Sequence, residues 1–201
     1  MTTPMDLLIV TLETASDRPV ERGDLSLALA GAELVDLLGA GAVTLHGDRI
    51  VPGTQRGMDD RLLDEAESSL DRVAPYESVE DWLWRRGRGL SEAYRATLDA
   101  EGDDTRQRRG WLRRRSDRQT PVDSPARRHA AERWGSGEPV LSGLAAVVGV
   151  HDEPVGDFEG FDADALVTVL AAVEDAVTEL AGVRQQRQIE EAAFDNMWRA
   201  P

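Results

Sequence analysis

The stretch Asp24-Leu-Ser-Leu-Ala-Leu-Ala-Gly-Ala-Glu-Leu-Val-Asp-Leu-Leu38 reads as a helix that faces a protein core. Its apolar positions recur every three or four residues, which is the spacing of one helical face; they are Leu27, Ala30, Gly31, Leu34, Val35 and Leu38. Asp24 is a residue type that commonly caps a helix N-terminus, and Gly39-Ala-Gly41 is a typical helix end. The pattern predicts a core helix capped by Asp24.

Shorter patterns flank this predicted helix on both sides. Downstream, Val43–Leu45 and Ile50–Val51 enclose His46-Gly-Asp-Arg49, which predicts a β-hairpin with a glycine-containing turn. Upstream, Leu7–Leu12 is a continuous aliphatic run. Such a run fits a buried strand or a short buried helix, and periodicity does not separate the two.

The rest of the chain carries mostly helical patterns. They cover 58–73, 78–98 with the capping sequence Ser78-Val-Glu-Asp81, 126–134, 139–148, a helix after Asp162, and 189–198. The helix after Asp162 has one long stripe, predicted to be the centre of the core: Leu166, Val169, Leu170, Val173, Val177, Leu180 and Val183. We therefore expect a mainly α protein, a single-domain helical bundle over 1–201 with one or two short β-hairpins.

The charge of the chain is unevenly distributed. The formal net charge is -15, which argues against nucleic acid as a partner because binding to phosphates needs cations. Residues 85–134, however, contain 14 arginines and 8 acidic residues, a net of +6. One basic surface on an acidic protein is the expectation that follows.

The most basic part of this region has no helical period. Residues 101–125 predict a long loop or hairpin, and 105–125 are expected to form an exposed basic one. Its centre is the sequence Trp111, Leu112, Arg113, Arg114, Arg115. Tryptophan settles at the headgroup depth of a membrane while arginines meet lipid phosphates, so these five residues are candidates for membrane contact. A solvated loop that offsets the acidic remainder is the alternative.

Signatures of enzymes and metal sites are missing from the sequence. His46, His129 and His151 lie in three different predicted elements, and no nucleophile-elbow, metalloprotease or P-loop pattern occurs. His129 and Glu132 share a helical face but have no adjacent third metal ligand. We expect no enzymatic activity, no cofactor and no metal. The absence of cysteine is typical of a reducing cytosol.

In their order along the chain, these elements resemble the Golgi phosphoprotein 3 family, as a bacterial member. The residues that carry the resemblance are Leu7–Leu12, Leu29–Leu37 with the following Ala42–Leu45, Leu62–Ala66 with Val79–Trp82, Leu141–Ala146, and the long helix after Asp162. The resemblance implies a helical single domain with a hydrophobic hairpin that enters the bilayer beside a phosphatidylinositol 4-phosphate site. Eukaryotic relatives use that site to retain Golgi glycosyltransferases.

The resemblance also implies where a lipid pocket would lie. The family pocket uses one tryptophan and three arginines, which correspond here to Glu21, Ala30, Arg88 and Ser91. Only Arg88 keeps the family residue, while nearby cations substitute for the others, so the expected headgroup-binding residues are Arg88, Arg22, Arg85 and Arg86. The family hairpin corresponds to about 110–125, where the reduced apolar tip implies shallower, more electrostatic insertion.

The expected function is that of a cytoplasmic protein that associates reversibly with anionic or phosphoinositide lipid. An adaptor that binds a protein partner, such as the tail of a membrane enzyme, is the first alternative. A winged-helix DNA-binding regulator is the second, but its recognition helix would carry Glu33 and Asp36 and no arginine. The lipid, the partner and the oligomeric state stay open.

Overall fold

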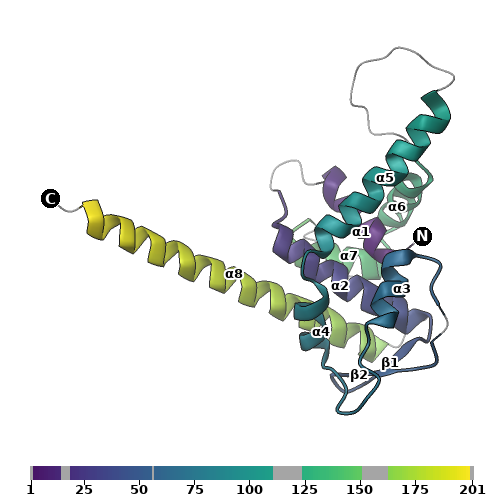
Figure 1. Cartoon of the computed structure of the whole chain (residues 1–201), viewed down its shortest axis with the longest axis horizontal. Coiled ribbons are helices and arrows are strands. Elements are labelled where there is room, and N and C mark those ends of the chain that lie inside the picture. Colours follow the sequence, from purple (N-terminus) through teal and green to yellow (C-terminus); the bar gives the residue numbers. More distant parts are fainter. Residues whose placement is uncertain (1, 15–18, 56, 111–123, 151–162, 200–201) are drawn as a thin grey trace.

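A computed structural model describes residues 2–14, 19–55, 57–110, 124–150 and 163–199, with only the helical backbone for 102–110, 193 and 195–199. These parts form eight helices and one antiparallel hairpin (Figure 1). The elements are α1 (Thr3–Thr14), α2 (Arg22–Gly39), β1 (Val43–His46), β2 (Arg49–Pro52), α3 (Arg61–Ser68), α4 (Val79–Arg86), α5 (Leu90–Gly110), α6 (Pro125–Gly135), α7 (Pro139–Val147) and α8 (Ala163–Arg199). The mainly α, single-domain prediction is confirmed.

Helix α2 is the centre of the core. Its residues from Leu25 to Val35 are all buried, and it contacts α1 and α8 most extensively, with α3, α4, α5 and α7 around it. The predicted capping residue is wrong: α2 begins at Arg22, after Glu21. Asp24 instead lies inside the first turn of α2, where its carboxylate accepts a hydrogen bond from Arg184 on α8.

Helix α8 is longer and less buried than its sequence pattern predicts. The predicted helix after Asp162 and the predicted helix 189–198 are one continuous helix, Ala163–Arg199. Leu166, Val169 and Val173 are buried against the body, but Val183 is 41% exposed. The prediction that this stripe is the centre of the core is therefore wrong. An amphipathic helix covers a core with one face, whereas α2 is apolar around most of its circumference.

Local chemistry explains the other element boundaries. The run Leu7–Leu12 lies in helix α1, which settles the open alternative, and the hairpin Val43–His46 with Arg49–Pro52 forms as predicted. The predicted helix 58–73 is reduced to α3, which Asp60 caps. The predicted helix 78–98 is divided into α4 and α5, and Gly89 between them has a φ of 70° that favours glycine.

The predicted basic loop begins later than its sequence suggests. Helix α5 continues to Gly110, so the expectation of a loop from Glu101 is wrong for the first ten residues of that stretch. Leu90, Tyr94 and Leu98 recur every four residues and pack the first half of this helix against the core. The polar residues that follow continue the same helical backbone. Residues 111–123, with the predicted tip, lie outside the described residues.

Gly31 sets how closely α2 and α8 approach each other. A Cβ atom at Gly31 would lie 2.4 Å from Cγ2 of Val173, which is far inside van der Waals contact. Val173 is β-branched and has little rotamer freedom in a helix, so it does not move aside easily. The contact between the two helices therefore requires glycine at this position.

Gly31→Ala is expected to lower the free energy of unfolding by about 1–3 kcal/mol, the usual cost of overpacking a core. Urea unfolding followed by circular dichroism measures it. The matched control is Gly182→Ala on the exposed side of α8, where a Cβ would meet nothing within 4 Å. Alanine favours helix there, so the control is expected to be neutral or stabilising by up to about 1 kcal/mol. Equal stabilities of the two variants would contradict this account.

Candidate anion-binding pocket

A pocket of about 480 Å³ lies where α2 begins, where α4 turns into α5, and where α8 leaves the body. Its lining residues are Arg22, Gly23, Ser26, Leu27, Trp84, Gly87, Arg88, Gly89, Glu92 and Leu180. Two of the four arginines predicted to bind a headgroup, Arg22 and Arg88, therefore share one pocket. Both are exposed at its surface.

Two helix N-termini converge on this pocket. The first turns of α2 and α5 both contribute to its lining, and the backbone N–H of Ser91 donates a hydrogen bond of 3.1 Å to Oγ of Ser26, which joins them. The capping residue of α2, Glu21, makes no side-chain hydrogen bond to the helix. The first N–H groups of α5 are already bonded, since those of Leu90 and Ala93 donate to the carbonyls of Gly87 and Gly89. The positive ends of the two helix dipoles still favour an anion here.

One carboxylate competes for the pocket. An oxygen of Glu92 lies 3.7 Å from Nη1 of Arg22, and the two side chains are 54% and 80% exposed. Hydrogen bonds from its own backbone N–H and from the Ser91 hydroxyl lower the pKa of Glu92, so it is ionised at neutral pH. Exposed pairs of this kind are weak, so Glu92 does not hold Arg22 firmly. Arg88 forms no ion pair within the described residues.

The pocket also has an apolar part. Its large apolar side chains are Leu27, Trp84 and Leu180. Gly23 lets α8 approach, because a Cβ there would lie 2.7 Å from Cδ2 of Leu180. Sequence reasoning missed Trp84 and Leu180. Trp84 lies on a different face of α4 from Trp82. Leu180 is 92 residues from Arg88 in the sequence, so no local pattern joins these residues to the arginines of the pocket.

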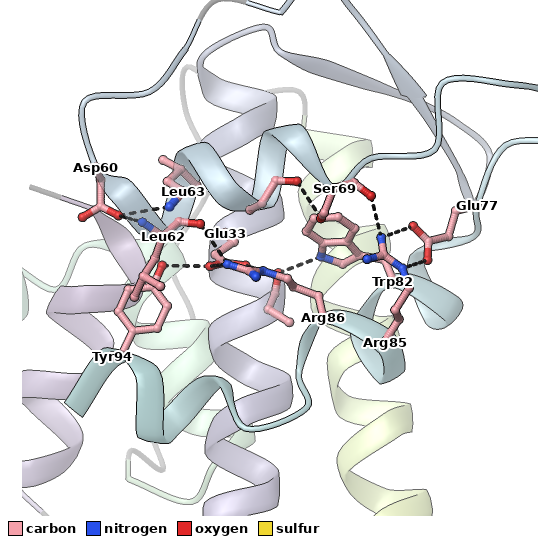
Figure 2. Close-up of polar contacts among 12 residues, drawn as sticks. Glu33, Asp60, Leu62, Leu63, Ser69, Glu77, Trp82, Arg85, Arg86 and Tyr94 are labelled. Carbon is pink, nitrogen blue, oxygen red and sulfur yellow. Dashed lines mark hydrogen bonds and ion pairs between the residues drawn. The ribbon is translucent and has the colours of Figure 1, made fainter. Parts of the chain in front are cut away.

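Arg86, the third predicted arginine, is a structural residue (Figure 2). Its Nε donates to Oε2 of Glu33 at 2.7 Å and its Nη2 donates to Oε1 at 2.9 Å and to the Leu62 carbonyl at 2.8 Å. The Tyr94 hydroxyl donates to the same carboxylate at 3.0 Å. Burial raises the pKa of Glu33, against the lowering effect of Arg86 and Tyr94. Arg86 is therefore committed to Glu33 and does not line the pocket.

Arg85, the fourth, points to another part of the surface (Figure 2). It donates two hydrogen bonds to Glu77, at 2.6 and 2.7 Å, and its guanidinium carbon lies 5.1 Å from the ring centre of Trp82. Trp82 is fully buried, and its indole N–H donates to the Ala30 carbonyl at 3.1 Å. Trp82 is thus a core residue.

The other three positions that the resemblance assigns to a lipid pocket do not line this one. Ala30 and Ser91 are fully buried, and Glu21 precedes α2 at the surface. The predicted membrane-contacting residues Trp111 to Arg115 lie outside the described residues. No group of three or more metal-ligating side chains occurs in the described part of the chain. No described helix is long and apolar enough to cross a membrane.

The fold and the pocket together define a mainly helical single domain with a small cationic and apolar surface site. Residues 4–192 match the family described as Golgi phosphoprotein 3 (GPP34). The chain therefore belongs to this family, which is known for lipid binding and is not an enzyme family. Neither the curated proteins nor the solved structures gave a match to the chain.

Arg86→Met is expected to destabilise the protein by about 3–5 kcal/mol, because it leaves the fully buried Glu33 carboxylate without its charge partner. Thermal or urea unfolding measures the change. The control is Arg61→Met, which breaks an exposed pair with Glu65 on α3 and is expected to cost less than about 1 kcal/mol. A loss at Arg86 no larger than that at Arg61 would show that the buried pair does not stabilise the fold.

Proposed function

We propose that this protein is a non-enzymatic peripheral membrane protein that binds the headgroup phosphate of anionic lipids between Arg22 and Arg88. The observation that carries the proposal is that one pocket holds two exposed arginines and the N-termini of two helices. An anion at this place gains charge-assisted hydrogen bonds from both guanidinium groups and a favourable interaction with both helix dipoles.

The apolar part of the pocket favours a lipid over a free inorganic anion. Leu27, Trp84 and Leu180 offer a surface to the glycerol and first acyl carbons while the phosphate meets the arginines. The sequence adds Trp111 to Arg115, proposed to contact the bilayer at headgroup depth. Binding through these groups is reversible and mainly electrostatic, as expected for a cytoplasmic protein that visits a membrane surface.

The composition of the pocket favours general anionic lipids over one phosphoinositide. Recognition of an additional ring phosphate needs further bidentate donors, and Arg85 and Arg86 are held by Glu77 and Glu33. A headgroup with one phosphate, such as phosphatidylglycerol, matches the two available arginines.

A role as a protein-interaction adaptor is the second candidate, and one surface favours it. A groove of about 350 Å³ between β1–β2, α4 and α8 has a floor of Val79, Ala172 and Ala176 and a rim of Asp48, Glu80, Asp175 and Glu179. Such a groove suits a basic, partly apolar peptide, for example the tail of a membrane enzyme. The DNA-binding alternative loses its recognition helix, because α2 is buried along Leu25–Val35.

Arg88→Ala is expected to weaken binding to phosphatidylglycerol vesicles about five-fold, since each cation near an anionic bilayer contributes about 1 kcal/mol. Glu92→Gln is expected to strengthen it, because the carboxylate that competes for Arg22 is removed. Vesicle flotation at several salt concentrations measures both, and binding should fall as salt rises. Arg61→Ala, with the same change of charge on α3, is the control. If Arg88→Ala and Arg61→Ala bind equally well, the pocket is not the lipid site.

Trp111→Ala and Arg113→Ala are expected to reduce vesicle binding independently of the pocket. The tryptophan contributes apolar contact at headgroup depth, so its loss should persist at high salt, whereas the loss at Arg113 should disappear there. Binding that is absent in the unmodified protein, or that ignores salt, rejects the membrane proposal as a whole. Binding of a basic, partly apolar peptide in the acidic groove of the same protein would then favour the adaptor role.

A further inference from the structure

The C-terminal half of α8 extends away from the body of the protein (Figure 1). The first half packs on α2, α4 and α7, but beyond Leu180 each side chain whose exposure is described is exposed except Arg184. Residues 181–199 span about 28 Å at the helical rise per residue. Arg184 near the start of this segment pairs with Glu21 and Asp24, and most helical stability in proteins comes from packing of an apolar face. A packing partner would stabilise it.

One face of this projecting segment has the spacing of a coiled-coil seam. Val183, Arg187, Glu190 and Phe194 follow one another at intervals of four, three and four residues. Val183 and Phe194 are 41% and 58% exposed, and Arg187 and Glu190 are exposed between them. Val183 follows Leu180 by three residues, so this seam continues the face with which α8 covers the core.

The seam is complementary to itself in one orientation only. When a second copy runs antiparallel with its Phe194 opposite Val183, Arg187 of each chain lies opposite Glu190 of the other. A parallel pair would place Arg187 against Arg187 and Glu190 against Glu190, and like charges in contact are unfavourable. We infer that α8 is a homodimerisation element, in which the segments 181–199 of two chains pair antiparallel through these four positions.

The charge of the whole protein supports the same orientation. Each chain has a formal net charge of -15, so two bodies side by side repel each other. In the antiparallel pair the bodies lie at opposite ends of the paired helices, about 25 Å apart along the helix axis by the helical rise. A membrane surface suits the seam less well, because the adjacent carboxylates of Glu190 and Glu191 would meet anionic lipid.

The interface is short, so the dimer should be weak and concentration-dependent. Two segments of this length bury less than the roughly 1,200 Å² of stable complexes. Sedimentation equilibrium of the intact protein over a wide concentration range is the measurement. Arg187→Glu and Glu190→Arg should each raise the dimer dissociation constant at least ten-fold, because each creates like-charge contacts at both ends of the pair.

The double variant that carries both Arg187→Glu and Glu190→Arg is the decisive test. It restores opposite charges across the dimer, so its dissociation constant should return to within a few-fold of the unmodified value. Glu174→Arg on α8, an exposed residue away from the seam, is the control and should leave dimerisation unchanged. A protein that stays monomeric at all concentrations, or a dimer that is insensitive to the single reversals, overturns the inference.

The orientation has its own test, which uses the absence of cysteine in the chain. Chains with Val183→Cys and chains with Phe194→Cys are mixed and treated with a short bismaleimide crosslinker. An antiparallel pair gives mainly mixed crosslinks between the two variants. Efficient crosslinking of either variant with itself shows a parallel pair and overturns the antiparallel arrangement. Circular dichroism of each variant confirms that the helices have formed.

Discussion

The burial of α2 on nearly all sides is the constraint on which the rest of the structure depends. A central helix must be apolar around its circumference, yet α2 carries Glu33 in its fully buried part. A lone carboxylate there would be very unfavourable, so the fold has to bring a cation to it. Arg86 at the end of α4 provides that cation, and Tyr94 and the Leu62 carbonyl complete the hydrogen bonds.

This pairing also determines where the pocket forms. Because Arg86 is held at Glu33, the residues that follow it must turn beside the first turns of α2. Gly87 allows the close approach to α2, since a Cβ atom there would lie 3.3 Å from the Ser26 carbonyl oxygen and 3.5 Å from Cδ2 of Leu27. The turn ends at Gly89 and α5 begins, which leaves Arg88 at the surface beside Arg22. The buried ion pair and the surface pocket are thus linked through the consecutive residues Arg86, Gly87 and Arg88.

The sequence predicts the elements better than it predicts the roles of charged residues. The spacing along Asp24–Leu38, the hairpin turn and the Ser78 cap are local, and each forms as expected apart from the capping role of Asp24. Arg85, Arg86 and Arg88 look equivalent in sequence. Arg86 differs from the other two because it pairs with the buried Glu33. Glu33 lies 53 residues away in the sequence, and a pairing over that separation has no local signature. The sequence does not predict the full length of α8 either, because the apolar period weakens after Val183 while the helix continues to Arg199.

An acidic protein needs an explanation for any affinity toward anions, and Arg184 supplies part of it. Asp24 and Glu21 border the start of α2, and Arg184 contacts both of them, with a hydrogen bond to Asp24 and 3.7 Å between Nη1 and the Glu21 carboxylate. Burial raises the pKa of Asp24, while Arg184 opposes that shift and holds the carboxylate. With these two acids engaged, Glu92 is the carboxylate that competes directly inside the pocket. Arg184 lies one turn beyond Leu180, so the residue that balances the pocket also marks where α8 leaves the body.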